Sequence, residues 1–297
     1  MVYANYLAPI DEYTNLPFRL LCQKYNACAT CAPLVNSTAI ARGEKIGRVD
    51  AHRDETNIGI QLVGNNPADI GRSMEILAEK MPFVSWFNLN CGCPSVRTRD
   101  SGGGGALLDQ PEIIEKLIGE MKKHTKKPVS VKIRLKHSIK ETVVLCKKIE
   151  AAGVNFIIIH GRTVKQGYSG KCNWNEIKMI NEQLEVPVVG NGDIQSLEQG
   201  NGLVKEGYCD SFMIGRAAMT NPMIFAGKQP DDLKDRIKLL KDYQKLYEKY
   251  VGTVETGDMK LKAVNFVSSV AKASELRNKI CRANSASMVL DILEKQN

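Results

Sequence analysis

The sequence has little of what metal sites are usually built from. It contains four histidines in 297 residues, no H-E-x-x-H motif and a single C-x-x-C, formed by Cys28 and Cys31. Because zinc sites need further cysteine or histidine pairs, the sequence predicts no bound metal. Core packing explains an isolated C-x-x-C inside a predicted strand better than redox or metal chemistry does.

Long apolar runs are missing as well. No stretch approaches the roughly 18 consecutive apolar residues of a membrane-spanning helix, and no basic segment precedes an apolar one near the N-terminus. The nine cysteines are an odd number, and without an export signal we expect them to be reduced thiols. We therefore expect a soluble, cytoplasmic protein that makes no membrane contact.

Two common nucleotide-binding motifs are also absent. No G-x-G-x-x-G follows a predicted strand, and no G-x-x-x-x-G-K-[ST] occurs anywhere. The glycine-rich residues 101–108 resemble a phosphate loop but lack the lysine and hydroxyl that would follow it. These absences argue against Rossmann and P-loop modes of nucleotide binding.

Positive charge is in excess, and it is densest near the C-terminus. The formal net charge is +8, and residues 228–297 contain 14 Lys and Arg against 10 Asp and Glu. That segment therefore carries as much net charge, +4, as the much longer segment before it. Such a balance favours polyanionic partners without proving one.

Eight short, apolar, β-branched runs alternate with amphipathic helical segments. The expected strands are residues 2–8, 27–32, 58–63, 84–89, 129–133, 156–159, 186–189 and 212–214. Eight alternations in about 225 residues predict an α/β fold, a (β/α)8 TIM barrel, rather than an open doubly wound sheet. After residue 227 only helical periodicity remains, so we expect two domains: a barrel at 1–227 and a small C-terminal helical bundle at 228–297.

In such barrels the chemistry lies at the C-terminal ends of the strands. Polar residues there include segments 9–11, 88–94, 160–163, 190–193 and 214–222. The glycine turn at 190–193 and the Ile-Gly-Arg at 214–216 together indicate a phosphate site, since they follow adjacent strands. Separately, each glycine turn could be a simple tight turn.

Lys132 lies in an otherwise apolar strand and shares the predicted interior face with Ser130 and Arg134. A buried, unpaired ammonium costs several kcal/mol, so an interior lysine needs an anion or an electron-rich partner. The alternative is a lysine that reaches the rim or pairs with a carboxylate. Gln61 also lies within an apolar strand. The alternative to a ligand contact there is an amide that forms its hydrogen bonds within the protein core.

The stretch N-L-N-C-G-C-P, residues 88–94, could hold metal ligands, a redox pair, a catalytic thiol or packed cysteines. Cys91 and Cys93 differ from the other cysteines because they lie where barrel chemistry is expected. With one residue between them and a turn following the strand, the two side chains cannot point the same way, so we expect one functional thiol and one packed thiol. From the residues alone, a structural role for Cys93 stays open.

Together these motifs resemble the tRNA-dihydrouridine synthases, FMN-dependent TIM-barrel enzymes with a C-terminal helical RNA-binding domain. The resemblance spans nearly the whole chain and rests on "NLNCGCP", "GGGGALLDQPEII", "VSVKIRL", "HGRTVKQGYSGKCNW", "VVGNGDI" and "IGRAAMTNP". It implies that Cys93 is the catalytic acid that protonates C5 of the target uracil, with Asn90 beside it in contact with the base. It also implies that Lys132 lies at the N1/O2 edge of the flavin.

The resemblance implies a larger set of contacts. The residues expected to bind FMN are Pro9, Ile10, Asp11, Gln61, Lys132, His160, Asn191, Gly192, Asp193, Gly215 and Arg216. The residues expected to contact the tRNA substrate are Asn90, Arg162, Arg277, Lys279 and Arg282, of which the last three could equally be ordinary solvated helix charges.

The sequence departs from the family pattern at two places. Asn88 stands where many relatives carry aspartate, and "CAPLVNS", residues 31–37, replaces a frequent Thr-Glu-Met-Val, so the tRNA position is not indicated. We expect a reductase of specific tRNA uridines that uses FMN and NADPH or NADH and requires no oligomer. The alternatives are a dihydroorotate or dihydropyrimidine dehydrogenase-like flavoenzyme acting on a free pyrimidine, and a non-catalytic RNA-binding barrel.

Overall fold

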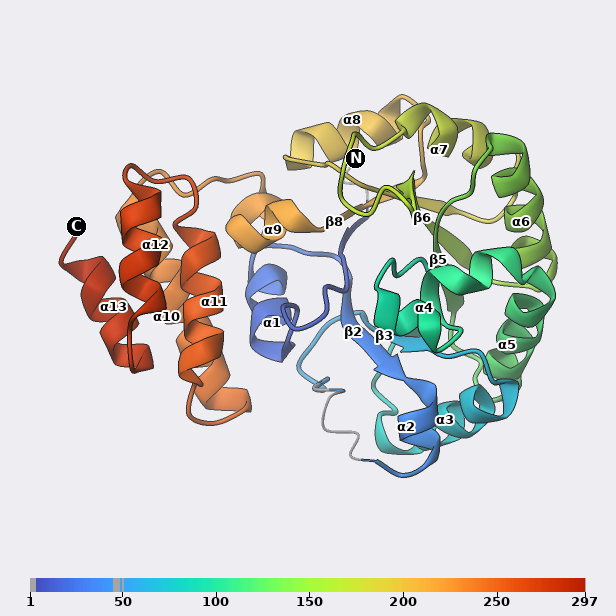
Figure 1. The fold of residues 1–297 in the computed structure, drawn as a ribbon, viewed down its shortest axis with the longest axis horizontal. Coiled ribbons are helices and arrows are strands. Elements are labelled where there is room, and N and C mark those ends of the chain that lie inside the picture. Colours follow the sequence, from blue (N-terminus) through green and yellow to red (C-terminus); the bar gives the residue numbers. More distant parts are fainter. Residues whose placement is uncertain (1–3, 45–48, 50, 297) are drawn as a thin grey trace.

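A barrel of eight parallel strands forms the larger part of the molecule (Figure 1). The computed structural model describes residues 4–44, 49 and 51–296. The strands are β1 (Asn5–Leu7), β2 (Thr30–Asn36), β3 (Ile58–Val63), β4 (Trp86–Cys91), β5 (Val129–Leu135), β6 (Phe156–Thr163), β7 (Val188–Asn191) and β8 (Ser211–Ile214). Each is hydrogen-bonded to the next around the sheet, and a bridge between Tyr6 and Ala29 joins β1 to β2. The predicted (β/α)8 barrel is confirmed.

Helices cover the outside of this barrel, except for the short α4 (Val96–Asp100), which lies over its mouth (Figure 1). The others are α1 (Leu16–Lys24), α2 (Ser37–Ala41), α3 (Pro67–Lys80), α5 (Pro111–Lys123), α6 (Ile139–Ala151), α7 (Trp174–Asn181), α8 (Leu197–Lys205) and α9 (Arg216–Thr220), with short 3-10 turns at Gly104–Asp109 and Pro222–Ala226. The start of α3 shows why they begin where they do. Asn66 accepts a hydrogen bond from the Ala68 N–H, and Pro67 occupies the first turn, where it loses no helical bond.

Some strands begin or end at other residues than predicted. β2 begins at Thr30 rather than residue 27 and continues to Asn36, and β6 extends to Thr163 rather than ending at residue 159. The parallel register explains the second difference, because Arg134 pairs with His160 and Leu135 with Thr163. Neighbouring strands therefore keep these polar residues in the sheet. The predicted start of β1 at residue 2 lies outside the described residues.

The lower half of the barrel interior is filled by side chains. Tyr6, Trp86 and Phe156 pack with ring centroids 5.5–6.1 Å apart, and Cys31 belongs to the same interior cluster. Trp86 fits only because residue 59 is glycine: a Cβ there would lie 2.3 Å from the indole. The base is thus a packed core, and a cavity lies toward the C-terminal ends of the strands.

Four helices follow the barrel and lie to one side of it, beside α1 and α9 (Figure 1). They are α10 (Leu233–Tyr250), α11 (Thr256–Phe266), α12 (Ala273–Cys281) and α13 (Ala286–Glu294). Ser285 caps the last helix by accepting a hydrogen bond from Met288 N–H. We call residues 228–297 the helical unit; its status as a separate domain stays a prediction.

Buried polar groups join the helical unit to the turn that follows β1. Lys262 of α11 is fully buried and donates to the Tyr13 carbonyl at 2.8 Å and to Asp258 at 3.3 Å. Its ammonium also lies 3.9 Å from the centre of the Tyr13 ring. Asn15 adds bonds to Tyr243 and Asp258. The helices therefore brace the turn at the barrel mouth.

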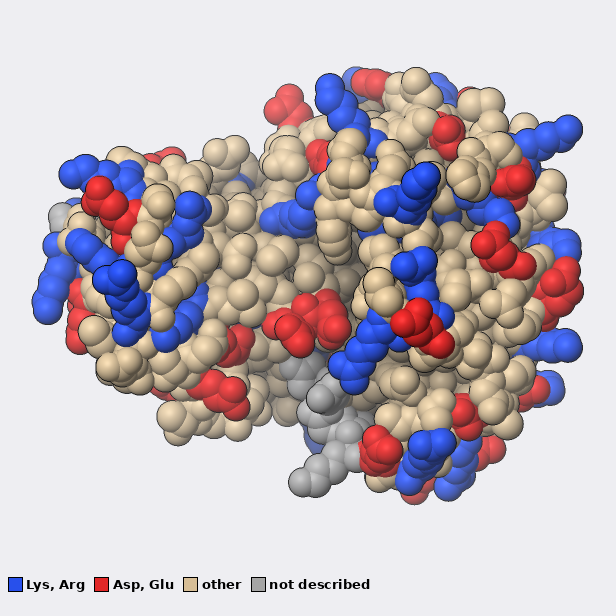
Figure 2. Space-filling model, in the orientation of Figure 1, with Lys and Arg blue, Asp and Glu red and all other residues tan. Residues whose placement is uncertain are grey.

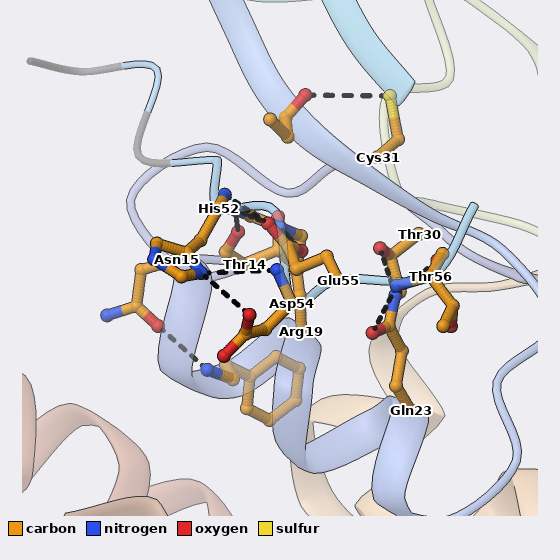
Figure 3. A network of polar contacts seen from close by, with 12 residues as sticks. Thr14, Asn15, Arg19, Gln23, Thr30, Cys31, His52, Asp54, Glu55 and Thr56 are labelled. Carbon is orange, nitrogen blue, oxygen red and sulfur yellow. Dashed lines mark hydrogen bonds and ion pairs between the residues drawn. The ribbon is translucent and has the colours of Figure 1, made fainter. Parts of the chain in front are cut away.

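A second buried network fixes the other side of that turn (Figure 3). Arg19 of α1 makes a bidentate pair with Glu55, at 2.7 and 3.0 Å, and donates to the Thr14 carbonyl at 2.7 Å. Gln23 binds the Thr56 carbonyl at 2.6 Å. The segment that leads into β3 is thereby tied to α1. Within the described part of the chain, no helix is both long and apolar enough to span a membrane.

Candidate active site

A cavity of about 410 Å³ opens at the C-terminal ends of the strands. This volume lies in the range of about 300–1,000 Å³ that small-molecule sites occupy. Thirteen of the predicted site residues line it: Pro9, Ile10, Asp11, Gln61, Asn90, Cys93, Lys132, His160, Asn191, Gly192, Asp193, Gly215 and Arg216. On the barrel face in Figure 2, lysine and arginine side chains border a hollow, with acidic side chains on the side toward the C-terminal helices. The structure thus brings together residues from the ends of seven strands.

The remaining predicted residues lie elsewhere. Arg162 is only 2% exposed and is absent from the cavity wall, because its guanidinium is turned into the loop after β6. There it donates to the Ser169 and Gly170 carbonyls at 3.1 and 2.7 Å. Arg277 and Lys279 lie on α12, and Arg282 caps its C-terminus, all in the helical unit.

The two cysteines of the N-C-G-C-P stretch differ in exposure. Cys91 ends β4 and is fully buried, and burial raises the pKa of its thiol far above the usual range. Cys93 is partly accessible and lines the cavity. Its backbone N–H donates to Asn90 Oδ1 at 2.9 Å, as the Gly92 N–H does at 3.0 Å. Asn90 therefore fixes the turn that carries the accessible thiol.

The glycine-rich loop that imitates a phosphate site packs around Cys93 instead. The Gly105 N–H donates to the Cys93 carbonyl at 3.0 Å, and Cys93 Sγ lies 3.6 Å from Thr98 Oγ1. Gly104 has φ +58°, and a Cβ there would approach Cys93 Cβ to 3.0 Å. These glycines let the backbone close over the cysteine turn, so their role is steric.

Lys132 supplies an uncompensated cation to the cavity. Its Nζ has no hydrogen-bond or ion-pair partner among the residues that the structure describes. Burial, and then the neighbouring Arg134, lowers the pKa of Lys132 to about 7. A cation held in this way provides a strong site for an anionic or electron-rich ligand.

His160 is the neutral member of this cluster. Its Nε2 lies 3.4 Å from Arg162 Nη1, and the side chain is 7% exposed. Burial, reinforced by Lys132 and the nearby arginines, lowers the pKa of His160 to about 2. The imidazole therefore stays uncharged at physiological pH and offers the cavity a neutral hydrogen-bonding ring.

Asp193 links the loops after β6 and β8. It adopts φ +54°, and its carboxylate accepts from Arg162 and Arg216 at 2.7 and 2.8 Å and from the Cys172 N–H at 2.9 Å. Burial alone would raise the pKa of Asp193, but these donors and cations lower it. Asp193 thus holds Arg216 at the cavity wall.

Comparison with known proteins places these features in a family. The model of the dihydrouridine synthase family matches residues 6–296, which include both the cavity and the helical unit. The chain belongs to the dihydrouridine synthase family. A relative from Aquifex aeolicus, named a probable tRNA-dihydrouridine synthase, is 29% identical over 97% of this chain and 94% of its own length. The tRNA-dihydrouridine(20a/20b) synthase [NAD(P)+] of Saccharomyces cerevisiae is 32% identical over 74% of this chain and 61% of its own.

Solved structures show the same barrel architecture at much lower identity. Histamine dehydrogenase from Rhizobium sp. 4-9 superposes with a TM-score of 0.53 at 12% identity, covering 82% of this chain and 49% of that one. This likeness concerns the fold. The family match, which runs through the helical unit, does not favour the free-pyrimidine alternative.

Tyr168 is a polar cavity residue that the sequence did not predict. Tyr168 lines the cavity, is 61% exposed and lies between Arg134 and Arg216, whose guanidinium carbons are 5.7 and 5.2 Å from its ring centre. The only signal was an aromatic residue between glycines in a long polar loop. The direction of the Tyr168 side chain depends on the loop conformation that Arg162 stabilises, and sequence periodicity does not indicate that conformation.

Proposed function

We propose that this chain is a flavin-dependent tRNA-dihydrouridine synthase that reduces the C5–C6 double bond of specific tRNA uridines, with FMN as its flavin and NADPH or NADH as the reductant. Family membership supports the reaction. The roles of individual residues rest on one observation. An accessible thiol, Cys93, and an unpaired cation, Lys132, line the same cavity.

The residues present fit a flavin phosphate. Lys132 on β5 provides a cation without a protein partner, while Gly215 and Arg216 follow β8, three strands away around the barrel. Gly192 has φ +127°, and a Cβ there would meet Cys172 Sγ at 2.6 Å, so only glycine lets the turn after β7 pack against Cys172 while it lines the cavity. Lys132 would stabilise negative charge on the ring, and Arg216 would bind the phosphate.

When bound, the reduced flavin supplies a hydride to C6 of the uracil. The chain supplies the proton. The Cys93 thiol donates it to C5, and Asn90 orients both the base and the cysteine turn. Because the C5–C6 edge is inaccessible in a stacked base, the target uridine must leave the RNA stack and enter the cavity.

The helical unit, residues 228–297, would bind the tRNA around that uridine. In this role Arg277, Lys279 and Arg282 contact phosphates. Replacing all three by alanine should weaken tRNA binding and reduce the slope of log affinity against log salt by about two to three. The matched control replaces Lys122, Lys123 and Lys126, near the C-terminal end of α5 and therefore on the opposite barrel face. An equal effect of both triple variants would remove the assigned phosphate contacts.

The flavin content of the protein and a comparison of two cysteine substitutions test the catalytic proposal. The purified protein should show a flavin absorption band, and tRNA from cells lacking it should lose dihydrouridine at a defined position. Cys93→Ala should keep the flavin but lower the reduction rate at least a hundredfold, the lower end of general-acid contributions. Cys91→Ala, which alters the neighbouring buried thiol, should retain turnover. Equal turnover by Cys93→Ala would eliminate the proton-donor role.

A further inference from the structure

A continuous chain of buried hydrogen bonds runs beneath the cavity to Cys93. Ser130 Oγ donates to the Phe87 carbonyl at 3.1 Å and accepts from Asn88 Nδ2 at 2.8 Å. Asn88 Oδ1 accepts from Gln61 Nε2 at 2.7 Å, and Gln61 Oε1 accepts from Asn90 Nδ2 at 2.8 Å. The chain ends where Asn90 Oδ1 accepts from two backbone N–H groups, Gly92 and Cys93, as described above.

Both ends of this chain are backbone groups, and they fix its direction. A carbonyl oxygen, that of Phe87, can only accept, while the backbone N–H groups of the cysteine turn can only donate. Between them, each amide must donate through nitrogen toward Phe87 and accept through oxygen from the Cys93 side. Reversing any amide would place N–H against N–H at a buried site. The backbone groups at the two ends therefore determine the orientations of the three side-chain amides between them.

The lower members of the chain do not reach the cavity. Asn88 and Ser130 are fully buried and are absent from its wall, whereas Gln61 and Asn90 line it. Neither lower residue can touch a ligand there. Their side chains act only through the amides above them.

We propose that Asn88 and Ser130 are positioning residues, which fix the direction of the Gln61 and Asn90 amides and thereby the placement of the Cys93 thiol. The proposal rests on the proposed function for its rate measurement. It also accounts for an uncharged residue at position 88. Asparagine completes the chain because it donates to Ser130 and accepts from Gln61 at the same time.

The first test compares Ser130→Ala with Ser73→Ala. Each removes one buried hydroxyl, but Ser73 lies on α3 and bonds the Ser37 and Asp69 carbonyls outside the chain. Ser130→Ala should lower kcat about tenfold, the equivalent of one hydrogen bond, with KM for tRNA changed less than twofold. Ser73→Ala should leave kcat within twofold. Equal kcat values for the two variants would overturn the proposal.

Two substitutions at position 88 distinguish the effect of hydrogen-bond direction from the effect of packing. Asn88→Asp keeps an acceptor for Gln61, and the single Ser130 hydroxyl proton then bonds the carboxylate instead of the Phe87 carbonyl. The links from position 88 up to Cys93 survive, so this variant should retain at least a third of kcat. Asn88→Leu keeps the branched shape of the side chain but removes the link, so it should lose about tenfold in kcat. An equal loss of kcat in both variants would show that the direction of these hydrogen bonds does not determine activity.

A readout independent of tRNA is the alkylation of Cys93 by iodoacetamide in the flavin-bound protein, followed by mass spectrometry of its peptide. Ser130→Ala and Asn88→Leu should change this rate severalfold, whereas Ser73→Ala and Asn88→Asp should not. Unchanged alkylation in the first two variants would refute the positioning role. If the wild type fails to reduce tRNA but the alkylation pattern holds, the proposed function has failed and the positioning chain stands.

Discussion

Replacing Lys132 by methionine should stabilise the flavin-free protein, because it removes a cation that the barrel interior holds without a partner. The side chains are similar in length, so packing changes little. The pKa of Lys132 falls from its usual 10.5 to about 7 in the folded protein. At about 1.4 kcal/mol for each pKa unit, this corresponds to at most about 5 kcal/mol of lost stability.

The sign of the pH dependence follows from proton counting. Between pH 7 and 10.5 the unfolded state binds the Lys132 proton while the folded state releases it, so wild-type stability rises with pH across this window. Below pH 7 both states are protonated and the penalty is complete. The advantage of Lys132→Met should therefore be largest at pH 6, at most about 2 kcal/mol at pH 9, and absent above pH 10.5.

Urea unfolding of the flavin-free proteins at pH 6, 7.5 and 9 measures this directly. The matched control is Lys140→Met, which alters an exposed lysine of α6 and should change stability by less than about 0.5 kcal/mol. Flavin titration should show weaker binding by Lys132→Met. A destabilised methionine variant, or a stability difference that is the same at all three pH values, would refute the reasoning.

Three further changes test the packing and charge of the fold. Gly59→Ala places a methyl group 2.3 Å from the Trp86 indole and should cost about 1–3 kcal/mol with altered tryptophan fluorescence; unchanged urea unfolding would contradict it. Lys262→Met leaves Asp258 without its buried cation and should cost about 3 kcal/mol, so a loss below about 0.5 kcal/mol would argue against the brace. With a folded-state pKa of about 2, His160 should show no ring titration by NMR between pH 5 and 8, and it should make stability fall as pH drops below its usual value of 6.5. A midpoint near 6.5 would show that the ring is solvated.

The barrel was predictable because apolar, β-branched runs specify buried parallel strands regardless of their neighbours. β3 has the predicted bounds, and the helices expected after residue 227 are α10 to α13. The polar ends of the strands were harder. His160–Thr163 looks like a loop in sequence, yet β6 continues there because β5 offers it backbone partners. Such pairing depends on register between distant segments, which local periodicity does not contain.

The cavity wall was similarly predictable from strand ends, but side-chain direction was not. Arg162 follows His160 by two residues, and alternation alone would turn both inward; the loop after β6 instead satisfies the guanidinium with its own carbonyls. Asn88 was expected near the rim and is fully buried. Its role emerged only from Gln61 and Ser130, which come from the strands on either side of β4.

The charges around the cavity connect the stability of the ligand-free protein to its affinity for a ligand. Lys132, Arg134 and Arg216 line it, while its acidic residues are Asp11 and Asp193, and Asp193 is already bound to arginine. The free energy that an unpaired Lys132 costs the empty barrel is recovered when an anion binds beside it, because the same charge enters both equilibria. Stability gained by Lys132→Met without flavin should therefore be accompanied by a loss of flavin affinity, and both effects should shrink as the pH rises above 7.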